Sequence, residues 1–125
     1  MDELEILKEL CAEYQKLLRI QDWEITLHLV DIIALPNDKQ VGHTSFSSDS
    51  KAATIKLLRE KEFFPVEGID RYDMEFFLVH ELLHIQFHSV HKEDCSEYEA
   101  AIDLTAKALV KLRREVSTCR RKLNA

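Results

Sequence analysis

The residues best suited to chemistry lie in one short segment, which contains the pattern His-Glu-x-x-His. His80 and His84 are four residues apart, and Glu81 follows the first of them. In an α-helix this spacing stacks two side chains on one face, ~6 Å apart along the axis, so both imidazoles can bind one metal ion. Zinc suits such a pair, and Glu81 is then placed to take a proton from a water bound to the metal. The pattern predicts a zinc (Zn²⁺) site with Glu81 as general base.

A catalytic zinc ion usually has three protein ligands and one open position, so the chain must supply a further ligand. His88 continues the same helix face but lies ~12 Å along the axis from His80, too far for one ion to contact both. We predict Glu99 as the third ligand, because two alanines follow it and allow its helix to approach the histidine helix closely. Asp103, one turn after Glu99, is predicted to accept the remaining N–H of a zinc-bound histidine.

Glu99 could instead cap its own helix, or another residue could be the third ligand. Ser96 and Glu99 match a capping box, in which Glu99 would bind the start of its own helix. Asp94 and Glu97 match the same device two residues earlier, and that arrangement leaves Glu99 free for the metal. His91, in the link between the helices, and Cys95, near the start of the last helix, are the alternative third ligands.

Hydrophobic periodicity predicts the elements that position these residues. The expected order is a helix over residues 3 to about 19, strands over 23–29, 41–46 and 52–58, a helix from Asp73 to about 89, and a last helix from 94–96 onward. The fold class is therefore α+β, with an N-terminal helix, a short three-stranded sheet, a buried helix that carries the site and a long C-terminal helix. Residues 1–125 are expected to form a single domain.

Composition limits the partners that the chain is expected to bind. The net charge is −6, which gives no reason to expect nucleic acid or an anionic membrane as the main partner. Three cysteines without a C-x-x-C pair do not indicate a disulfide framework, and no basic start with an apolar run suggests a signal peptide. A cytoplasmic protein is expected. The basic residues near the C-terminus are assigned to the helix dipole; they are Lys111, Arg113, Arg114, Arg120, Arg121 and Lys122.

The segment from His80 to Asp103 resembles the gluzincin zinc metallopeptidases, and the match is closest to small cytoplasmic or phage-type versions. Those enzymes pair H-E-x-x-H on one helix with a glutamate on a following helix, here matched by Glu99. The resemblance implies a zincin-like fold, with the active-site helix beneath a twisted sheet whose edge strand can pair with an extended substrate. It also implies that the chain hydrolyses peptide bonds in a peptide or protein.

Other interpretations stay open. The metzincin pattern would require Gly at Phe87 and His at Val90, and it fails at both positions. A SprT-like protease, which acts on nucleic-acid-associated proteins, would use a later histidine such as His91. A zinc-binding regulatory or interaction module without peptidase activity is the alternative from another class. The donor that would stabilise the oxyanion is not fixed by the sequence; the candidates are His43, Tyr72, His91 and Tyr98.

Overall fold

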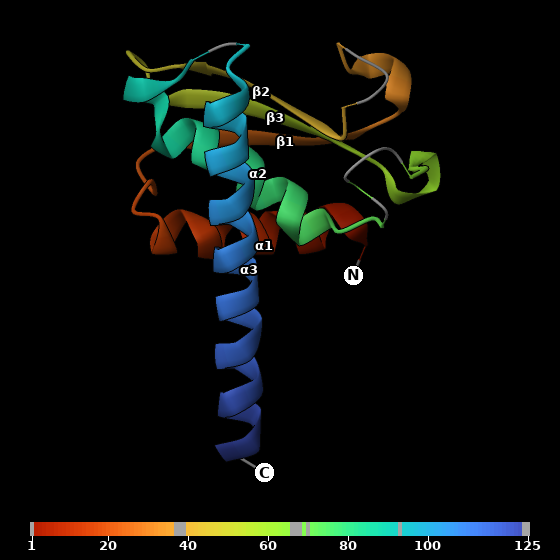
Figure 1. The fold of residues 1–125 in the computed structure, drawn as a ribbon, viewed down its shortest axis with the longest axis vertical. Helices are drawn as coiled ribbons and strands as arrows, with labels where there is room; N and C mark the ends of the chain where they lie inside the picture. The colour runs from red at the N-terminus through yellow and green to blue at the C-terminus, as the bar shows by residue number, and fades with distance from the viewer. Residues whose placement is uncertain (1, 37–39, 66–68, 70, 93, 124–125) are drawn as a thin grey trace.

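The computed structural model describes residues 2–36, 40–65, 69, 71–92 and 94–123. Within them the chain is α+β, with three α-helices and a three-stranded mixed sheet (Figure 1). The elements are α1 (Glu3–Leu17), β1 (Glu24–Val30), β2 (Gly42–Ser47), β3 (Ala52–Leu58), α2 (Met74–Gln86) and α3 (Ser96–Leu123), with 3₁₀ turns at Ile32–Ala34, Glu60–Glu62 and His88–Val90. The predicted order of helices and strands is confirmed. The predicted loop over 35–39 lies in part outside the described residues.

The sheet places one alternating set of side chains against the helices. Its strand order is β1-β3-β2; β1 runs parallel to β3, and β2 runs antiparallel to β3. Leu27 of β1 pairs with Ile55 of β3, and Ile55 pairs in turn with Thr44 of β2. Because successive residues of a strand point to opposite faces, Thr44 shares the inward face with the fully buried Ile55. The polar side chain of Thr44 therefore faces the helices.

Helix α2 lies in the middle of the molecule, beneath the sheet and above α1 (Figure 1). Asp73 caps it by accepting a hydrogen bond from the Phe76 N–H at 3.1 Å, as predicted. The helix ends at Gln86, earlier than the predicted end near residue 89, and a 3₁₀ turn follows. The His88 Nδ1 lies 2.9 Å from the Ile85 carbonyl, so an N–H at this atom satisfies one of the last acceptors of α2. None of the described helices is long and apolar enough to cross a membrane.

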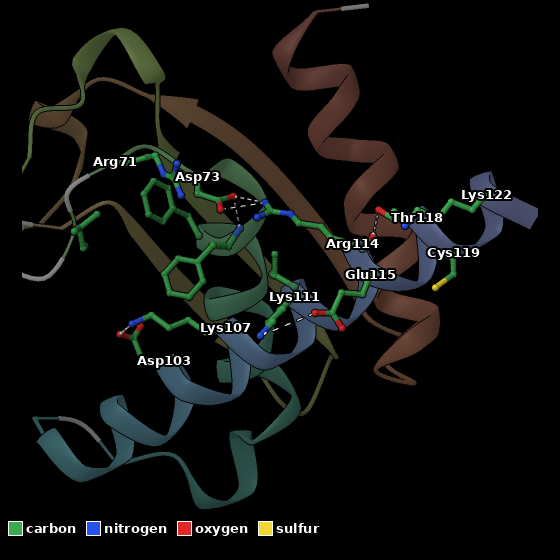
Figure 2. Close-up of a pocket in the computed structure, with 14 residues that line it drawn as sticks. Arg71, Asp73, Asp103, Lys107, Lys111, Arg114, Glu115, Thr118, Cys119 and Lys122 are labelled. Carbon is green, nitrogen blue, oxygen red and sulfur yellow. Dashed lines mark hydrogen bonds and ion pairs between the residues drawn. The ribbon is translucent and has the colours of Figure 1, made fainter. Parts of the chain in front are cut away.

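Helix α3 crosses α2 and then continues beyond the rest of the fold (Figure 1). The part of α3 up to Val110 is anchored by Ile102, Ala106 and Val110, which are all buried. A hollow of about 720 Å³ lies between α3 and the start of α2 (Figure 2). Asp73, Asp103 and Arg114 are among the residues that line it.

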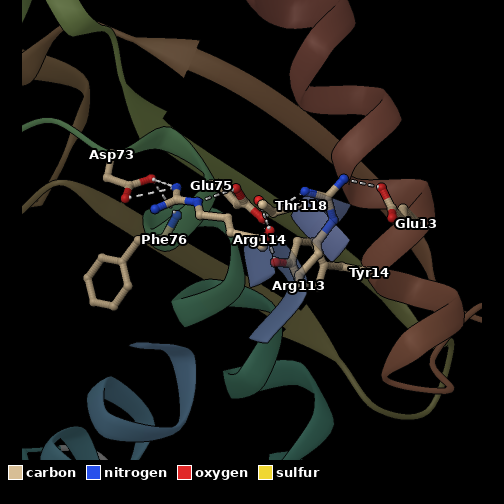
Figure 3. A network of polar contacts seen from close by, with 8 residues as sticks. All are labelled: Glu13, Tyr14, Asp73, Glu75, Phe76, Arg113, Arg114 and Thr118. Atoms are coloured by element: carbon tan, nitrogen blue, oxygen red, sulfur yellow. Dashed lines mark hydrogen bonds and ion pairs between the residues drawn. The ribbon is translucent and has the colours of Figure 1, made fainter. Parts of the chain in front are cut away.

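Glu75 is the centre of a polar network that joins the three helices (Figure 3). It accepts hydrogen bonds from the Tyr14 hydroxyl at 2.6 Å, from Arg113 at 3.2 Å and from Arg114 at 3.2 Å. Arg113 also pairs with Glu13 at 2.6 Å. Two of the basic residues that were assigned to the helix dipole therefore connect α3 to α1 and α2, and for them that assignment is wrong.

We expect replacement of Glu75 by Ala to lower the free energy of unfolding by about 2–3 kcal/mol, because three donors would lose their shared acceptor. The Glu75 side chain is only 11% exposed, so water cannot fully replace it. Chemical denaturation of the metal-free protein measures the change. Glu9→Ala removes an exposed carboxylate from α1 and is the matched control; an equal loss in both variants would contradict the role of the network.

Candidate metal centre

Helix α2 presents His80 and His84 on one face, as the four-residue spacing requires. Their ring centroids are 5.1 Å apart. The two side chains are 18% and 10% exposed, so the pair lies at the edge of the core with one side open to a hollow. This hollow has a volume of about 450 Å³ and lies between α2, the start of α3 and the edge strand β2. The histidines are therefore buried enough to be fixed, yet a ligand can reach them.

Glu99 reaches this pair from the first turn of α3. One of its carboxylate oxygens lies 3.2 Å from His80 Nε2, and the other lies 3.3 Å from His84 Nε2. The three residues each offer a ligand atom, and these atoms all lie within 4.8 Å of one another. Donors around a tetrahedral ion at ~2.0 Å are themselves about 3.3 Å apart, so the group fits the size of a metal site. His80, His84 and Glu99 can hold a metal ion.

Asp103 fixes the orientation of His80. Its carboxylate lies 3.0 Å from Nδ1 of that ring, on the side away from Glu99. When Nδ1–H donates to Asp103, the Nε2 lone pair of His80 is left for a metal. His84 has no such support, because its Nδ1 is buried and lacks a hydrogen-bond partner among the described residues. His80 is the more tightly oriented of the two histidines.

We expect Asp103→Ala to weaken zinc binding about 10- to 100-fold, the range typical for loss of an acceptor behind a histidine ligand. Asp103→Asn keeps an acceptor oxygen and should lose less. Competition titration against a chromophoric chelator measures both affinities. If Asp103→Ala bound zinc as tightly as the unaltered chain, the proposed orientation of His80 would be wrong.

Burial lowers the pKa of His84 to about 4, although the neighbouring Glu99 carboxylate raises it in part. The imidazole of His84 is therefore neutral near pH 7. Only the neutral form has a lone pair to give to a metal ion, so the surroundings of His84 suit a ligand.

Glu81 lies on α2 between the two histidines and is buried, with only 7% of its surface exposed. Burial raises its pKa, whereas the neighbouring His80 and the Thr44 hydrogen bond lower it. Thr44 on β2 donates its hydroxyl proton to one carboxylate oxygen at 2.7 Å. The other oxygen lies against Gly42, where an added Cβ would meet it at 3.1 Å and Leu57 at 2.9 Å. Strand β2 thus holds Glu81 through a hydroxyl and a glycine.

Neither Thr44 nor Gly42 was predicted from the sequence. The signal that was available is the inward-facing set of the strand, Gly42, Thr44 and Phe46, in which a glycine and a threonine stand where core side chains are expected. A polar residue at an inward-facing position requires a partner. The buried glutamate of the H-E-x-x-H helix is that partner.

Replacing Thr44 by Val should lower the free energy of unfolding by about 1–3 kcal/mol, because a buried carboxylate oxygen of Glu81 would lose its donor. Thr44→Ser retains the hydroxyl and should recover most of this stability. Thermal and chemical denaturation of the metal-free proteins measure the difference. Equal stability of the Val and Ser variants would exclude a role for the hydroxyl.

The candidate oxyanion donors separate into two groups. Tyr72 lies away from the centre, since its hydroxyl donates to the Leu58 carbonyl at 2.9 Å and its ring packs on Phe77. His43 and His91 line the same hollow as the histidine pair. Tyr98 lies beside that pair, with its ring centroid 5.6 Å from the His84 ring. These three side chains stay candidates.

Two further histidines that were considered as ligands, His88 and His91, lie outside the metal-binding group among the described residues. His88 packs edge-on against Trp23 at 5.4 Å and is not part of the metal-binding group among the described residues. His91 lies 5.5 Å from His84, ring centre to ring centre, and is also outside that group. The larger hollow beside α3 includes neither histidine of the H-E-x-x-H pattern, so the chemistry is assigned to the smaller one.

The start of α3 differs from both predicted capping boxes. The Glu99 N–H donates to the Cys95 carbonyl at 3.1 Å, so Cys95 occupies the cap position. Asp94 has a φ of 53°, which is not the extended conformation of a cap residue, and its predicted role is wrong. The Glu99 side chain makes its polar contacts with the two histidines, not with the start of its own helix.

Comparison of the chain with protein-family profiles, with curated protein sequences and with solved structures gave no significant match. The assignment of a function therefore rests on the residues of the site and on their geometry.

Proposed function

We propose that this protein is a zinc-dependent metallopeptidase of the gluzincin type, with a small zincin-like fold. The observation that carries the proposal is the convergence of His80, His84 and Glu99, whose ligand atoms lie within 4.8 Å of one another, with Glu81 buried beside them. Two histidines and a glutamate are a ligand set used by zinc peptidases. A purely structural zinc site has no need of a buried carboxylate next to its ligands.

The donor set fits zinc better than the hard cations. Imidazole nitrogen is a poor ligand for magnesium and calcium, which prefer oxygen, and two of the three donors here are imidazoles. Bound zinc would supply Lewis acidity, lowering the pKa of a water to ~7 and polarising the carbonyl of the substrate.

The residues of the chain divide the remaining work. His80 and His84 would bind the zinc ion together with Glu99. Asp103 holds the His80 ring in place by accepting the Nδ1–H of that ring. Glu81 takes the proton of the attacking water and delivers it to the leaving amine. Thr44 donates its hydroxyl proton to Oε1 of Glu81 and so helps to hold the carboxylate in place. Burial of Glu81 raises its pKa, which brings the carboxylate closer to the range in which a base works well.

The substrate in this proposal is an extended segment of a peptide or protein. Strand β2 is at the edge of the sheet and lines the hollow that contains the two histidines. An edge strand has unpaired backbone groups on its outer side, and an extended peptide can pair with them. That pairing would carry a scissile bond past Glu81.

A direct test removes metal from the purified protein with a chelator, restores zinc, and follows cleavage of a mixed peptide library by mass spectrometry. We expect one zinc ion per chain, and hydrolysis only after restoration. Failure to bind zinc would exclude every zinc-based function. Zinc binding without cleavage of any peptide would favour the second candidate, a zinc-binding module without peptidase activity.

The position of the His91 ring, 5.5 Å from the ring of His84, favours the SprT-like alternative. Replacing His91 by Ala distinguishes the two third ligands. The gluzincin assignment predicts zinc affinity near that of the unaltered chain, whereas the SprT-like assignment predicts a loss as large as that from removing His84.

A further inference from the structure

The second half of α3 carries an apolar stripe that no described residue covers. Leu112, Val116 and Leu123 are 57%, 43% and 84% exposed, and Cys119 is also exposed. This half of the helix extends beyond α1 (Figure 1). The buried residues of α3, Ile102, Ala106 and Val110, precede the stripe, and Arg113 and Arg114 bind α1 and α2 through polar contacts. These contacts leave the stripe itself exposed.

The spacing of the stripe is that of a coiled coil. Its members, Leu112, Val116, Cys119 and Leu123, follow one another at intervals of four, three and four residues. These intervals match alternating d and a positions of a heptad, with Leu112 and Cys119 at d and Val116 and Leu123 at a. Val116 at a and Leu112 at d match the combination that favours two strands. Over so short a segment, the drift of a straight helix from the heptad repeat is about 20° per heptad, which keeps the stripe on one face.

The charges beside the stripe indicate which partner fits it. Glu115 falls at a g position and Arg120 at the e position five residues later. In a parallel pair, each g residue faces the following e residue of the other helix, so Glu115 of one copy would meet Arg120 of the other, twice by symmetry. The segment is thus complementary to itself in the parallel arrangement.

We propose that residues 112–123 of α3 form a parallel two-stranded coiled coil with a second copy of this chain, which makes the protein a symmetric homodimer. The seam lies in the second half of α3, whereas Glu99 and Asp103 lie in the first. Each copy keeps its own metal centre. The proposal is independent of the proposed function, because the contact uses none of the residues of that centre.

Sedimentation equilibrium under reducing conditions is the first test. We expect a concentration-dependent mass that reaches twice the 14.6 kDa of one chain. Val116→Glu puts a charge in the seam and should weaken association about 10-fold or more. Thr118→Glu adds the same charge at an outward c position and should change association little. A monomer at every soluble concentration, or equal effects of both variants, would overturn the proposal.

A charge exchange tests self-association against binding to some other protein. Glu115→Arg and Arg120→Glu should each weaken the dimer, and the double variant should restore it, because the exchange recreates both pairs. No restoration would overturn the proposed pairing.

The direction of the helices is tested by oxidation with copper phenanthroline in air. The parallel register places Cys119 against Cys119, so the two thiols should lose two protons and two electrons to the oxidant and form a disulfide-linked dimer. Cys119→Ser should abolish the link. A dimer that cannot be linked through Cys119 would overturn the parallel arrangement.

Discussion

Replacing Glu99 by Ala is expected to weaken zinc binding at least about 100-fold, because a direct ligand contributes more than the acceptors behind it, whose loss costs about 10- to 100-fold. The two carboxylate oxygens of Glu99 lie 3.2 and 3.3 Å from the histidine nitrogens, and no other described acidic residue joins that group. Zinc affinity is measured by competition with a chromophoric chelator. The same variant should lose the rise in melting temperature that zinc gives to the unaltered chain, since a ligand that binds only the folded state stabilises it.

Glu97→Ala is the matched control for this variant. Glu97 is exposed on the same turn of α3, and its carboxylate contacts the side chains of Cys95 and Ser96. We expect it to leave zinc affinity unchanged. Because the Glu99 side chain is 51% exposed, its removal should leave the metal-free fold intact. Unchanged zinc affinity after loss of Glu99 would assign the third ligand to another residue, with His91 the nearest candidate.

Replacing Glu81 by Gln should abolish most peptidase activity and leave the zinc site in place. Gln has nearly the same shape and can still accept the Thr44 hydroxyl, so the fold and the metal ligands should be preserved. It cannot take a proton from water, and loss of general-base catalysis typically lowers kcat about 10²- to 10⁴-fold. Because the change affects proton transfer and not substrate binding, KM should change little. Steady-state kinetics on a cleaved peptide separate the two constants.

Glu97→Gln is the control for this change, because it alters the same functional group outside the hollow that contains the histidines. Its kcat should equal that of the unaltered chain. Full activity of the Glu81→Gln variant, with zinc bound, would remove Glu81 from the role of base and favour another source of catalysis.

The elements of this fold could be predicted from the sequence because they depend on local periodicity. The third strand was predicted over 52–58, which are its bounds in the structure, since its apolar residues alternate and turn residues precede it. The strand order was not predictable in the same way. Alternation gives the face of each residue but not the neighbour of each strand, so the parallel pairing of β1 with β3 became known only from the structure.

The network around Glu75 shows a second limit of sequence reasoning. Arg113 and Glu75 are 38 residues apart, and nothing in the local pattern of α3 marks Arg113 as the partner of a residue on α2. A run of basic residues near a helix end has the same local pattern whether it faces solvent or another helix. Only the crossing of α3 over α2 brings the charges together.

The parts of the site that lie on regular helices could be predicted from the sequence, and the parts that depend on strand order or on a link could not. The helical spacing predicted that His80 and His84 share a face, and the structure brings Glu99 and Asp103 to them. Thr44 was missed because its contact with Glu81 depends on which strand lies at the edge of the sheet above α2. The cap at Asp94 was wrong because the link before α3 takes a left-handed conformation there, which the sequence does not indicate.

Diffraction from crystals of the zinc-loaded protein, recorded on both sides of the zinc absorption edge, locates the metal ion and identifies its ligands. We expect one anomalous peak per chain, bound by Nε2 of His80, Nε2 of His84 and a carboxylate oxygen of Glu99, at ~2.0–2.2 Å from each. A peak held by other residues, or no peak at this centre in zinc-loaded crystals, would contradict the proposed metal centre.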